Sequence, residues 1–302
     1  MARNQRVTTG AVLTFHGLRE DAAAAGVLDD SLHMSVAKFR RICAHLAARY
    51  RVMPLLEMVQ LLKAGEPLPA RAVAITFDDG YASNHELGFP VLQEFGLAAT
   101  IFLTTGFLDG TLPLWFQEMD LAFQSKGKTA AELSELLPKL KALPTAELRV
   151  QVQHHLAEIP YPAELPSVMR PMSWNTAREM LKSGLIDFGG HTHTHPIMAR
   201  CDTAQQEMEI QTCRARMEAE LGCAPRLFAY TNGGPGDFTE ETQGLLRKHG
   251  FEAAFTMMGG RLTQGLGYQK LPRYGSPETV LEAEAMASGA FELLKKWRGG
   301  GR

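Results

Sequence analysis

Short apolar segments, separated by amphipathic segments of helical length, recur along the sequence and constrain the fold more than any other feature. They lie at residues 12–15, 73–77, 99–103, 186–190, 227–230 and 253–256. Each segment is too short and too apolar to be half exposed, so each is expected to form a strand buried on both faces. Buried strands that alternate with helices are typical of a parallel sheet covered by helices. The sequence therefore predicts an α/β fold.

The length of 302 residues permits one domain or two, and α/β barrels of about 200 to 300 residues commonly form one domain. We favour a single domain over 1–302. Residues 106–171 lack strand signals and contain a long polar helical segment at 129–158, followed by a proline-rich stretch. We expect them to form an insertion over one end of the barrel. Trp115 and Phe116 are candidates for exposed rings that shape a substrate groove, and the alternative is that they anchor the insertion.

Three helix boundaries carry local signals. Thr203 and Gln206 have the spacing of a capping box, and Ser276 before Pro277 has the pattern of a helix start. Gly250 follows a basic helical end and is expected to terminate that helix.

The balance of charge excludes one class of partner. Lysine and arginine number 31 against 33 acidic residues, for a net charge of −2. This balance gives no electrostatic reason to expect a nucleic acid partner. The four cysteines have neither metal-ribbon spacing nor the density of a disulfide scaffold, so free thiols are expected.

The chain shows no signal for export or for membrane insertion. No apolar stretch near the N-terminus resembles a signal peptide, and no segment is long enough to span a bilayer. We therefore predict a cytoplasmic location.

Residues 281–298 have a helical pattern with a basic end, which allows contact with a membrane surface, but docking on the barrel or solvation is the favoured interpretation. That end comprises Lys295, Lys296, Trp297 and Arg298.

Two adjacent carboxylates follow the segment 73–77 directly. Asp78, Asp79 and Gly80 stand where an α/β barrel places its active site, just past the C-terminal end of a strand. Neighbouring carboxylates at a strand end point in different directions, so one can bind a metal ion while the other faces the substrate. The alternative is a simple Asp-Asp-Gly turn.

Three histidines, His191, His193 and His195, lie within five residues after the segment 186–190. Neutral imidazole is a common ligand of zinc-like ions, which favours a metal site. The flanking glycines and Pro196 argue against a helix, so His191 and His195 would converge through a turn. If the strand continued instead, all three rings would face one side. With the aspartates they suffice for a catalytic metal site that keeps an open position.

With these two motifs, the chain resembles the polysaccharide deacetylases of carbohydrate esterase family 4, the NodB-homology family. The family motif T-F-D-D-G stands at 76–80, and H-[ST]-x-x-H is matched at 191–195. The resemblance covers roughly residues 10–105 and 172–275. It implies a distorted (β/α)7 barrel and the metal-dependent removal of N-acetyl groups from a sugar polymer or oligosaccharide.

The resemblance also implies the roles of individual residues. Asp79, His191 and His195 would bind one divalent metal ion, commonly zinc, and Asp78 would act as the general base. His193 would then be an intervening residue that supports the ligands rather than a ligand itself.

The third family motif, R-x-P-Y-G, departs from the pattern. Residues 229–233 read A-Y-T-N-G, so the arginine that would orient the base is missing. Arg273, in the segment L-P-R-Y, is our candidate for that role. A backbone N–H near Asn232 remains a candidate oxyanion donor, because no particular side chain is needed. His16, in L-T-F-H-G at the end of the first strand, could enter the site, and the alternative is an ordinary histidine at a strand end.

Two other functions stay open at this point. One is metal-dependent hydrolysis of another non-peptide C–N bond, as in a cyclic imide, ureide or formyl amide. The other is a carbohydrate-binding barrel without catalysis, which the altered third motif permits and the two intact motifs disfavour.

Overall fold

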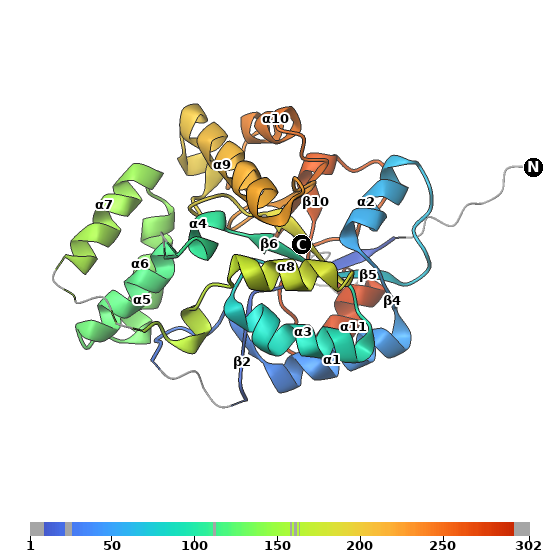
Figure 1. Ribbon diagram of the computed structural model, residues 1–302, viewed down its shortest axis with the longest axis horizontal. Coiled ribbons are helices and arrows are strands. Elements are labelled where there is room, and N and C mark those ends of the chain that lie inside the picture. Colours follow the sequence, from blue (N-terminus) through green and yellow to red (C-terminus); the bar gives the residue numbers. More distant parts are fainter. Residues whose placement is uncertain are drawn as a thin grey trace, which may run out of the picture.

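The computed structural model describes residues 9–21, 26–110, 113–157, 159, 162 and 164–292. Its centre is a parallel sheet surrounded by helices (Figure 1). In spatial order the strands are β1 (Ala11–Phe15), β5 (Ala72–Phe77), β6 (Ala99–Leu103), β7 (Ile186–Gly190), β8 (Leu227–Ala229), β9 (Ala253–Thr256) and β10 (Leu271–Pro272). A two-residue strand, β4 (Arg51–Val52), also pairs with β5 and is not part of this order.

The two edges of the sheet meet, so that the seven strands form a nearly closed barrel. Thr14 N donates to Tyr274 O at 3.0 Å, and Tyr274 N donates to Val12 O at 2.9 Å. These bonds join β1 to Tyr274, two residues beyond the end of β10, through a bridge between Leu13 and Tyr274. The expected distorted barrel of seven strands is therefore confirmed.

The barrel strands are buried on both faces, as expected for a parallel sheet covered by helices. In the seven strands only Asp187 and Pro272 are partly buried, and all other residues are buried. Each of the six predicted strands is present, with ends that differ by at most one residue. The seventh, β10, and the small pair β2 (Gly17–Arg19) and β3 (His33–Ser35) were not predicted.

Helices cover the outside of the barrel (Figure 1). They are α1 (Val36–Arg49), α2 (Leu55–Lys63), α3 (Phe89–Phe95), α8 (Trp174–Lys182), α9 (Thr203–Leu221), α10 (Glu240–Lys248) and α11 (Val280–Ser288). Helix α1 shows why they pack there: it buries Phe39, Ile42, Cys43 and Leu46, which recur at helical spacing on one face.

Two of the predicted helix starts are wrong. The cap of α9 is Asp202, whose side chain accepts from Gln205 N, and the cap of α11 is Thr279. Thr203 and Ser276 therefore do not cap these helices. The predicted stop is confirmed, because Gly250 follows α10 with a left-handed φ of 81°.

The insertion is helical and projects to one side of the barrel (Figure 1). It contains α4 (Thr105–Leu108), α5 (Trp115–Ser125), α6 (Ala130–Lys141), α7 (Thr145–Leu156) and the 3-10 turn η2 (Ser167–Met169). The polar segment predicted as one helical run is two helices, because α6 ends at Lys141 and α7 starts at Thr145, directly after Pro144. Apolar faces of α5, α6 and α7 form a small core of their own around Met119, Leu133 and Val152.

This small core changes the interpretation of the two aromatic residues. Trp115 packs into it and is 3% exposed, so the expectation that its ring is exposed is wrong. The same core contains leucines of α6 and α7, and the local sequence does not indicate that Trp115 shares a core with them. Phe116 is only partly buried.

No helix in the described part of the chain is long and apolar enough to cross a bilayer. Lys295, Lys296, Trp297 and Arg298, on which the alternative of membrane contact depends, lie outside the described residues. The four cysteines are free thiols, as predicted, and Cys223 alone among them is exposed.

Candidate functional site

The polar residues singled out from the sequence meet at one end of the barrel. Asp78 and Asp79 follow β5, His191 follows β7, and Arg273 follows β10. Because all these strands are parallel, their C-terminal ends open toward the same end, where α/β barrels place their active sites.

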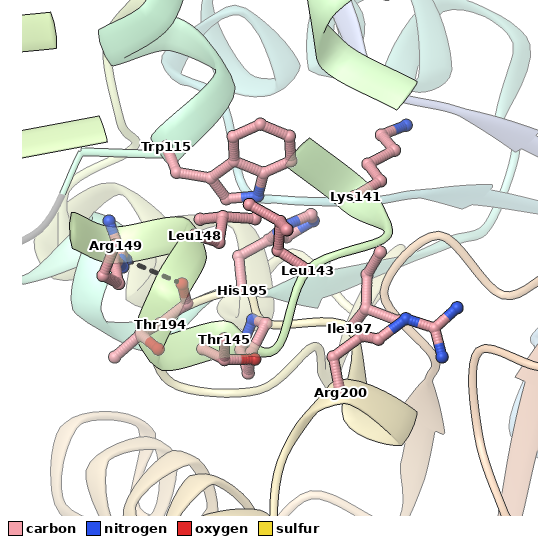
Figure 2. A pocket seen from close by; sticks show the side chains of 11 residues that line it. Trp115, Lys141, Leu143, Thr145, Leu148, Arg149, Thr194, His195, Ile197 and Arg200 are labelled. Carbon is pink, nitrogen blue, oxygen red and sulfur yellow. Dashed lines mark hydrogen bonds between the residues drawn. The ribbon is translucent and has the colours of Figure 1, made fainter. Parts of the chain in front are cut away.

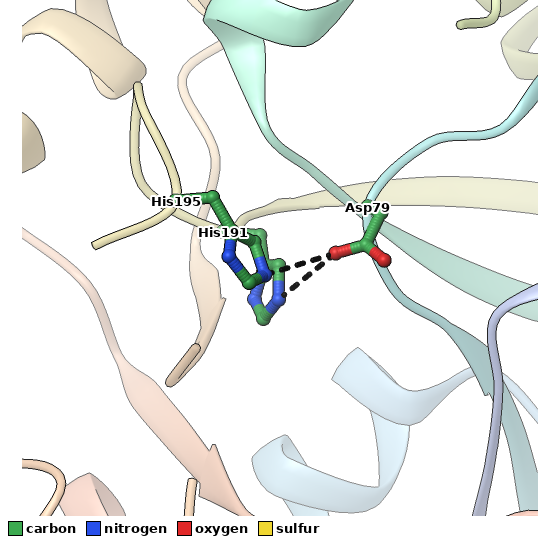
Figure 3. A group of neighbouring side chains, drawn as sticks. All are labelled: Asp79, His191 and His195. Atoms are coloured by element: carbon green, nitrogen blue, oxygen red, sulfur yellow. Dashed lines mark ion pairs between the residues drawn. The ribbon is translucent and has the colours of Figure 1, made fainter. Parts of the chain in front are cut away.

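Asp79, His191 and His195 form a compact cluster (Figure 3). Asp79 Oδ1 lies 3.4 Å from His191 Nε2 and 3.2 Å from His195 Nε2. One ligand atom from each residue lies within 4.8 Å of the others. Asp79 and His191 are buried, the His195 side chain is 13% exposed, and all three residues line one cavity.

The donor atoms of this cluster suit a divalent cation. His191 Nδ1 lies 2.8 Å from Ala229 O, which only an N–H can satisfy, so whenever the ring is neutral Nε2 presents its lone pair to Asp79. Asp79 Oδ1 is buried and has no hydrogen-bond partner of good geometry. Lone pairs that face one another in a buried place are unfavourable unless a cation lies between them. One carboxylate and two imidazoles form a donor set found in catalytic zinc sites.

The ionisation of the cluster is set by contacts among its members. Burial acts to lower the pKa of His191, but Asp78 and Asp79 raise it above its ordinary value. Burial acts to raise the pKa of Asp79, but its contacts with His191 and His195 hold that pKa well below the ordinary value. Burial lowers the pKa of His195, and Asp79 offsets this only in part. At neutral pH the cluster therefore offers an ionised carboxylate and a neutral His195 ring, the forms that bind metal ions.

A strained turn brings the two histidines together. Thr192 and His195 adopt left-handed φ angles of 68° and 59°, and Asp79 one of 73°. Such conformations of non-glycine residues concentrate at functional sites. Thr192 Oγ1 accepts from His195 N at 3.0 Å and closes the turn. His193 is directed elsewhere, with Nδ1 2.9 Å from Thr105 Oγ1, so the predicted convergence through a turn is present.

Asp78 is paired with the arginine proposed from the sequence. Arg273 donates from both terminal nitrogens, to Asp78 Oδ1 and Oδ2, each at 2.7 Å. The arginine is fully buried and also contacts Thr76 Oγ1 at 3.2 Å. Burial acts to raise the pKa of Asp78, but the Arg273 guanidinium and His191 hold it below its ordinary value. Asp78 is therefore an ionised carboxylate with a fixed orientation.

A cavity of about 330 Å³ opens over these groups. The insertion forms one wall, with Trp115, Phe116, Leu137 and Lys141. The Phe116 ring lies edge-on to His195, with ring centroids 5.5 Å apart. Lys141 Nζ reaches across to Asn232 Oδ1 at 3.1 Å. Lys141 was not identified from the sequence, because a lysine in the last helical turn is usually a solvated end residue.

The barrel side of the same cavity includes His16 and Asn232. The position of His16 is fixed through its backbone, because Asn84 Nδ2 donates to His16 O at 2.6 Å. Asn232 has a left-handed φ of 61°, and its side chain donates to Asp237 Oδ2 at 2.6 Å. The structure thus brings all six predicted site residues to one end of the barrel: His16, Asp78, Asp79, His191, His195 and Arg273.

A much smaller cavity, of about 10 Å³, lies behind His195 (Figure 2). It is lined by residues of the insertion, including Trp115, Leu148 and Arg149, together with Thr194. Arg149 donates to Thr194 O at 3.2 Å, and Glu118 pairs with the same arginine at 3.3 Å. The insertion therefore packs directly on the histidine turn.

Known proteins resemble parts of this chain in sequence. A family model described as polysaccharide deacetylase matches residues 65–254. The poly-beta-1,6-N-acetyl-D-glucosamine N-deacetylase of Escherichia coli K12 is 34% identical over 86 residues, which are 28% of this chain and 12% of that protein. The putative polysaccharide deacetylase YxkH of Bacillus subtilis is 52% identical over 33 residues, 11% of this chain. The match thus spans 12% of the length of each of these relatives.

Solved structures share the fold over nearly the whole chain. IcaB from Ammonifex degensii superposes with a TM-score of 0.65 at 20% identity, covering 93% of this chain and 98% of that one. The Streptococcus pyogenes deacetylase PplD, solved with acetate, gives a TM-score of 0.63 at 15% identity, covering 92% and 98%. At these identities the likeness shows the fold alone. The family match extends over more than half of the chain, and the chain therefore belongs to the polysaccharide deacetylase family.

Proposed function

We propose that the protein is a metal-dependent N-deacetylase that removes acetyl groups from an N-acetylated sugar polymer or oligosaccharide. The observation that carries this proposal is the cluster of Asp79, His191 and His195 beside the arginine-paired Asp78 in one cavity. The Escherichia coli relative acts, by its name, on poly-beta-1,6-N-acetyl-D-glucosamine, which supports the choice of an N-acetylated sugar.

In this proposal Asp79, His191 and His195 hold one divalent ion, and zinc suits the mixed nitrogen and oxygen donors best. When bound, the ion supplies a Lewis acid that makes the acetyl carbonyl more electrophilic and the attacking water more acidic. The hydrogen bond from His191 Nδ1 to Ala229 O keeps the other ring nitrogen free for the ion.

Asp78 is assigned as the general base. Arg273 occupies one lone pair on each carboxylate oxygen, and each oxygen keeps another that can accept a proton from water in the cavity. The low pKa of Asp78 keeps it ionised at neutral pH, as a base requires.

His16 and the turn at Asn232 are assigned to the remaining steps. The water oxygen adds to the acetyl carbon while its proton passes to Asp78, and a backbone N–H near Asn232 stabilises the negative charge on the carbonyl oxygen. Breakage of the C–N bond then needs a proton on the departing nitrogen. His16 lines the cavity and is our candidate for that donor. The products are acetate and the free amine of the sugar.

Acetate release from N-acetylglucosamine oligomers tests the proposal. The zinc-loaded protein is expected to release acetate, to lose this activity on chelation, and to regain it when zinc is restored. Turnover of a cyclic imide, ureide or formyl amide without acetate release would favour hydrolysis of another C–N bond. Oligomer binding by the zinc-loaded protein without any turnover would favour the carbohydrate-binding barrel.

A further inference from the structure

Behind the histidine turn lies a buried acidic side chain that the proposed mechanism does not use. Glu209, in the middle of α9, is 0% exposed. Its Oε2 accepts from His193 N and from Thr194 N, both at 2.8 Å. Its Oε1 accepts from Thr194 Oγ1 at 2.5 Å. Both oxygens of Glu209 therefore accept hydrogen bonds from the turn. The carboxylate form suits this role best, because neither of its oxygens carries a proton.

A carboxylate without exposure needs compensation, because removing it from water is unfavourable. No lysine or arginine pairs with Glu209 within the described ranges of the chain. The compensation comes from the turn itself, whose successive N–H groups converge on the carboxylate. Such consecutive N–H groups form a concave anion-binding arrangement, which here encloses a side chain of the same protein.

The position of these N–H groups gives Glu209 a specific effect. His193 and Thr194 lie between the two histidines of the cluster, His191 and His195, and the left-handed residues Thr192 and His195 flank them. Left-handed conformations are unfavourable for residues other than glycine and persist only where surrounding contacts enforce them. Glu209 supplies such contacts, because it accepts hydrogen bonds from His193 and Thr194 within the turn.

We infer that Glu209 is a positioning residue for the metal-binding histidines: it holds the turn in the shape that presents His191 and His195 to the ion. This inference rests on the proposed metal-dependent function and adds a residue on α9 to the determinants of metal affinity. Mutation of a residue that orients metal-binding side chains without contacting the ion typically changes the metal affinity about 10- to 100-fold.

The same helix offers a matched control. Gln206 lies one turn earlier on α9 and is 3% exposed. Its Nε2 donates to Cys201 O at 3.1 Å, and its Oε1 accepts from Thr242 Oγ1 at 2.7 Å. Gln206→Met removes buried hydrogen bonds from α9 without touching the histidine turn.

The test is zinc affinity, measured by titrating metal-free protein in competition with a chromophoric chelator. Glu209→Gln keeps the shape but loses the charge and replaces one acceptor oxygen with a donor amide. Its zinc Kd is expected to rise about 10- to 100-fold, whereas Gln206→Met stays within a few-fold of wild type at a similar loss of Tm. In the metal-free protein, the amides of His193 and Thr194 are expected to exchange with solvent faster in Glu209→Gln.

A second variant keeps the inference testable if Glu209→Gln does not fold. Thr194→Val removes one of the contacts to Glu209 and is expected to weaken zinc binding in the same direction by a smaller factor. Unchanged zinc affinity in the folded Glu209 or Thr194 variants overturns the inference, as does an equal loss in Gln206→Met. A wild-type protein that binds no zinc overturns the proposed function itself.

Discussion

Replacing Arg273 by methionine isolates the effect of the buried ion pair on Asp78. Arg273 is 0% exposed and contacts both oxygens of Asp78, whose side chain is 3% exposed. Breaking a buried pair by removing one partner destabilises a protein by about 3 to 5 kcal/mol, because the other charge stays buried without compensation. Asp78 can avoid part of this loss by binding a proton.

The direction of the pH effect follows from the causes of the pKa shift. In the wild type the pKa of Asp78 is low, so its ionised form stabilises the fold above the pKa of the unfolded chain. This contribution is lost as the pH falls through the folded pKa. Without Arg273, burial dominates and the pKa of Asp78 rises. The acidic limb of kcat/KM for acetate release is therefore expected to move to higher pH.

The assay is the pH profile of acetate release, with bound zinc measured in the same samples. Arg216→Met is the control, since Arg216 makes a similar two-nitrogen contact with Asp109. The side chains of this pair are 36% and 15% exposed, so water screens it more than the Arg273 pair, and its loss should cost less and leave the acidic limb in place. An Arg273→Met protein that keeps its zinc and the wild-type acidic limb would refute the reasoning.

Three further predictions concern the ligands and the cavity wall. His195→Ala should lower zinc occupancy sharply and His193→Ala much less, and equal losses on metal analysis would point to a three-histidine site. Trp115→Ala should destabilise the protein by about 3 to 5 kcal/mol in denaturant unfolding, as expected for a large ring removed from a core, and a wild-type stability would contradict its packed role. Phe116→Ala should raise KM for long oligomers more than for short ones with little change in Tm, and equal KM changes would exclude a substrate contact.

The strands were predictable because each is a short, mostly apolar segment between segments of helical pattern, which is typical of a buried strand. The strand β10 has only two residues, Leu271 and Pro272, and is too short to give a pattern. It completes the barrel and places Arg273 on Asp78, a contact across 195 positions of sequence. The arginine could be proposed only because the family motif lacked one at its usual place.

The errors arise where distant contacts override local pattern. Thr203 and Gln206 have capping-box spacing, but Gln206 is used in buried contacts and Asp202 caps the helix. Trp115 is buried in a core that includes leucines from helices that follow it in sequence. Glu209 gave no signal, because a glutamate in a polar helix is usually solvated. The cytoplasmic location stays a prediction.

The measurement that tests the central claim most directly compares the two adjacent aspartates. Zinc content and acetate release are measured for Asp78→Asn and Asp79→Asn purified in parallel. Asp79→Asn is expected to lose zinc and activity together, because it removes a charged ligand. Asp78→Asn is expected to keep one zinc per chain and the fold but to lose about 10²-fold or more in kcat, the size expected for a missing general base. Release of the metal by Asp78→Asn, or turnover within a few-fold of wild type, would contradict the division of roles.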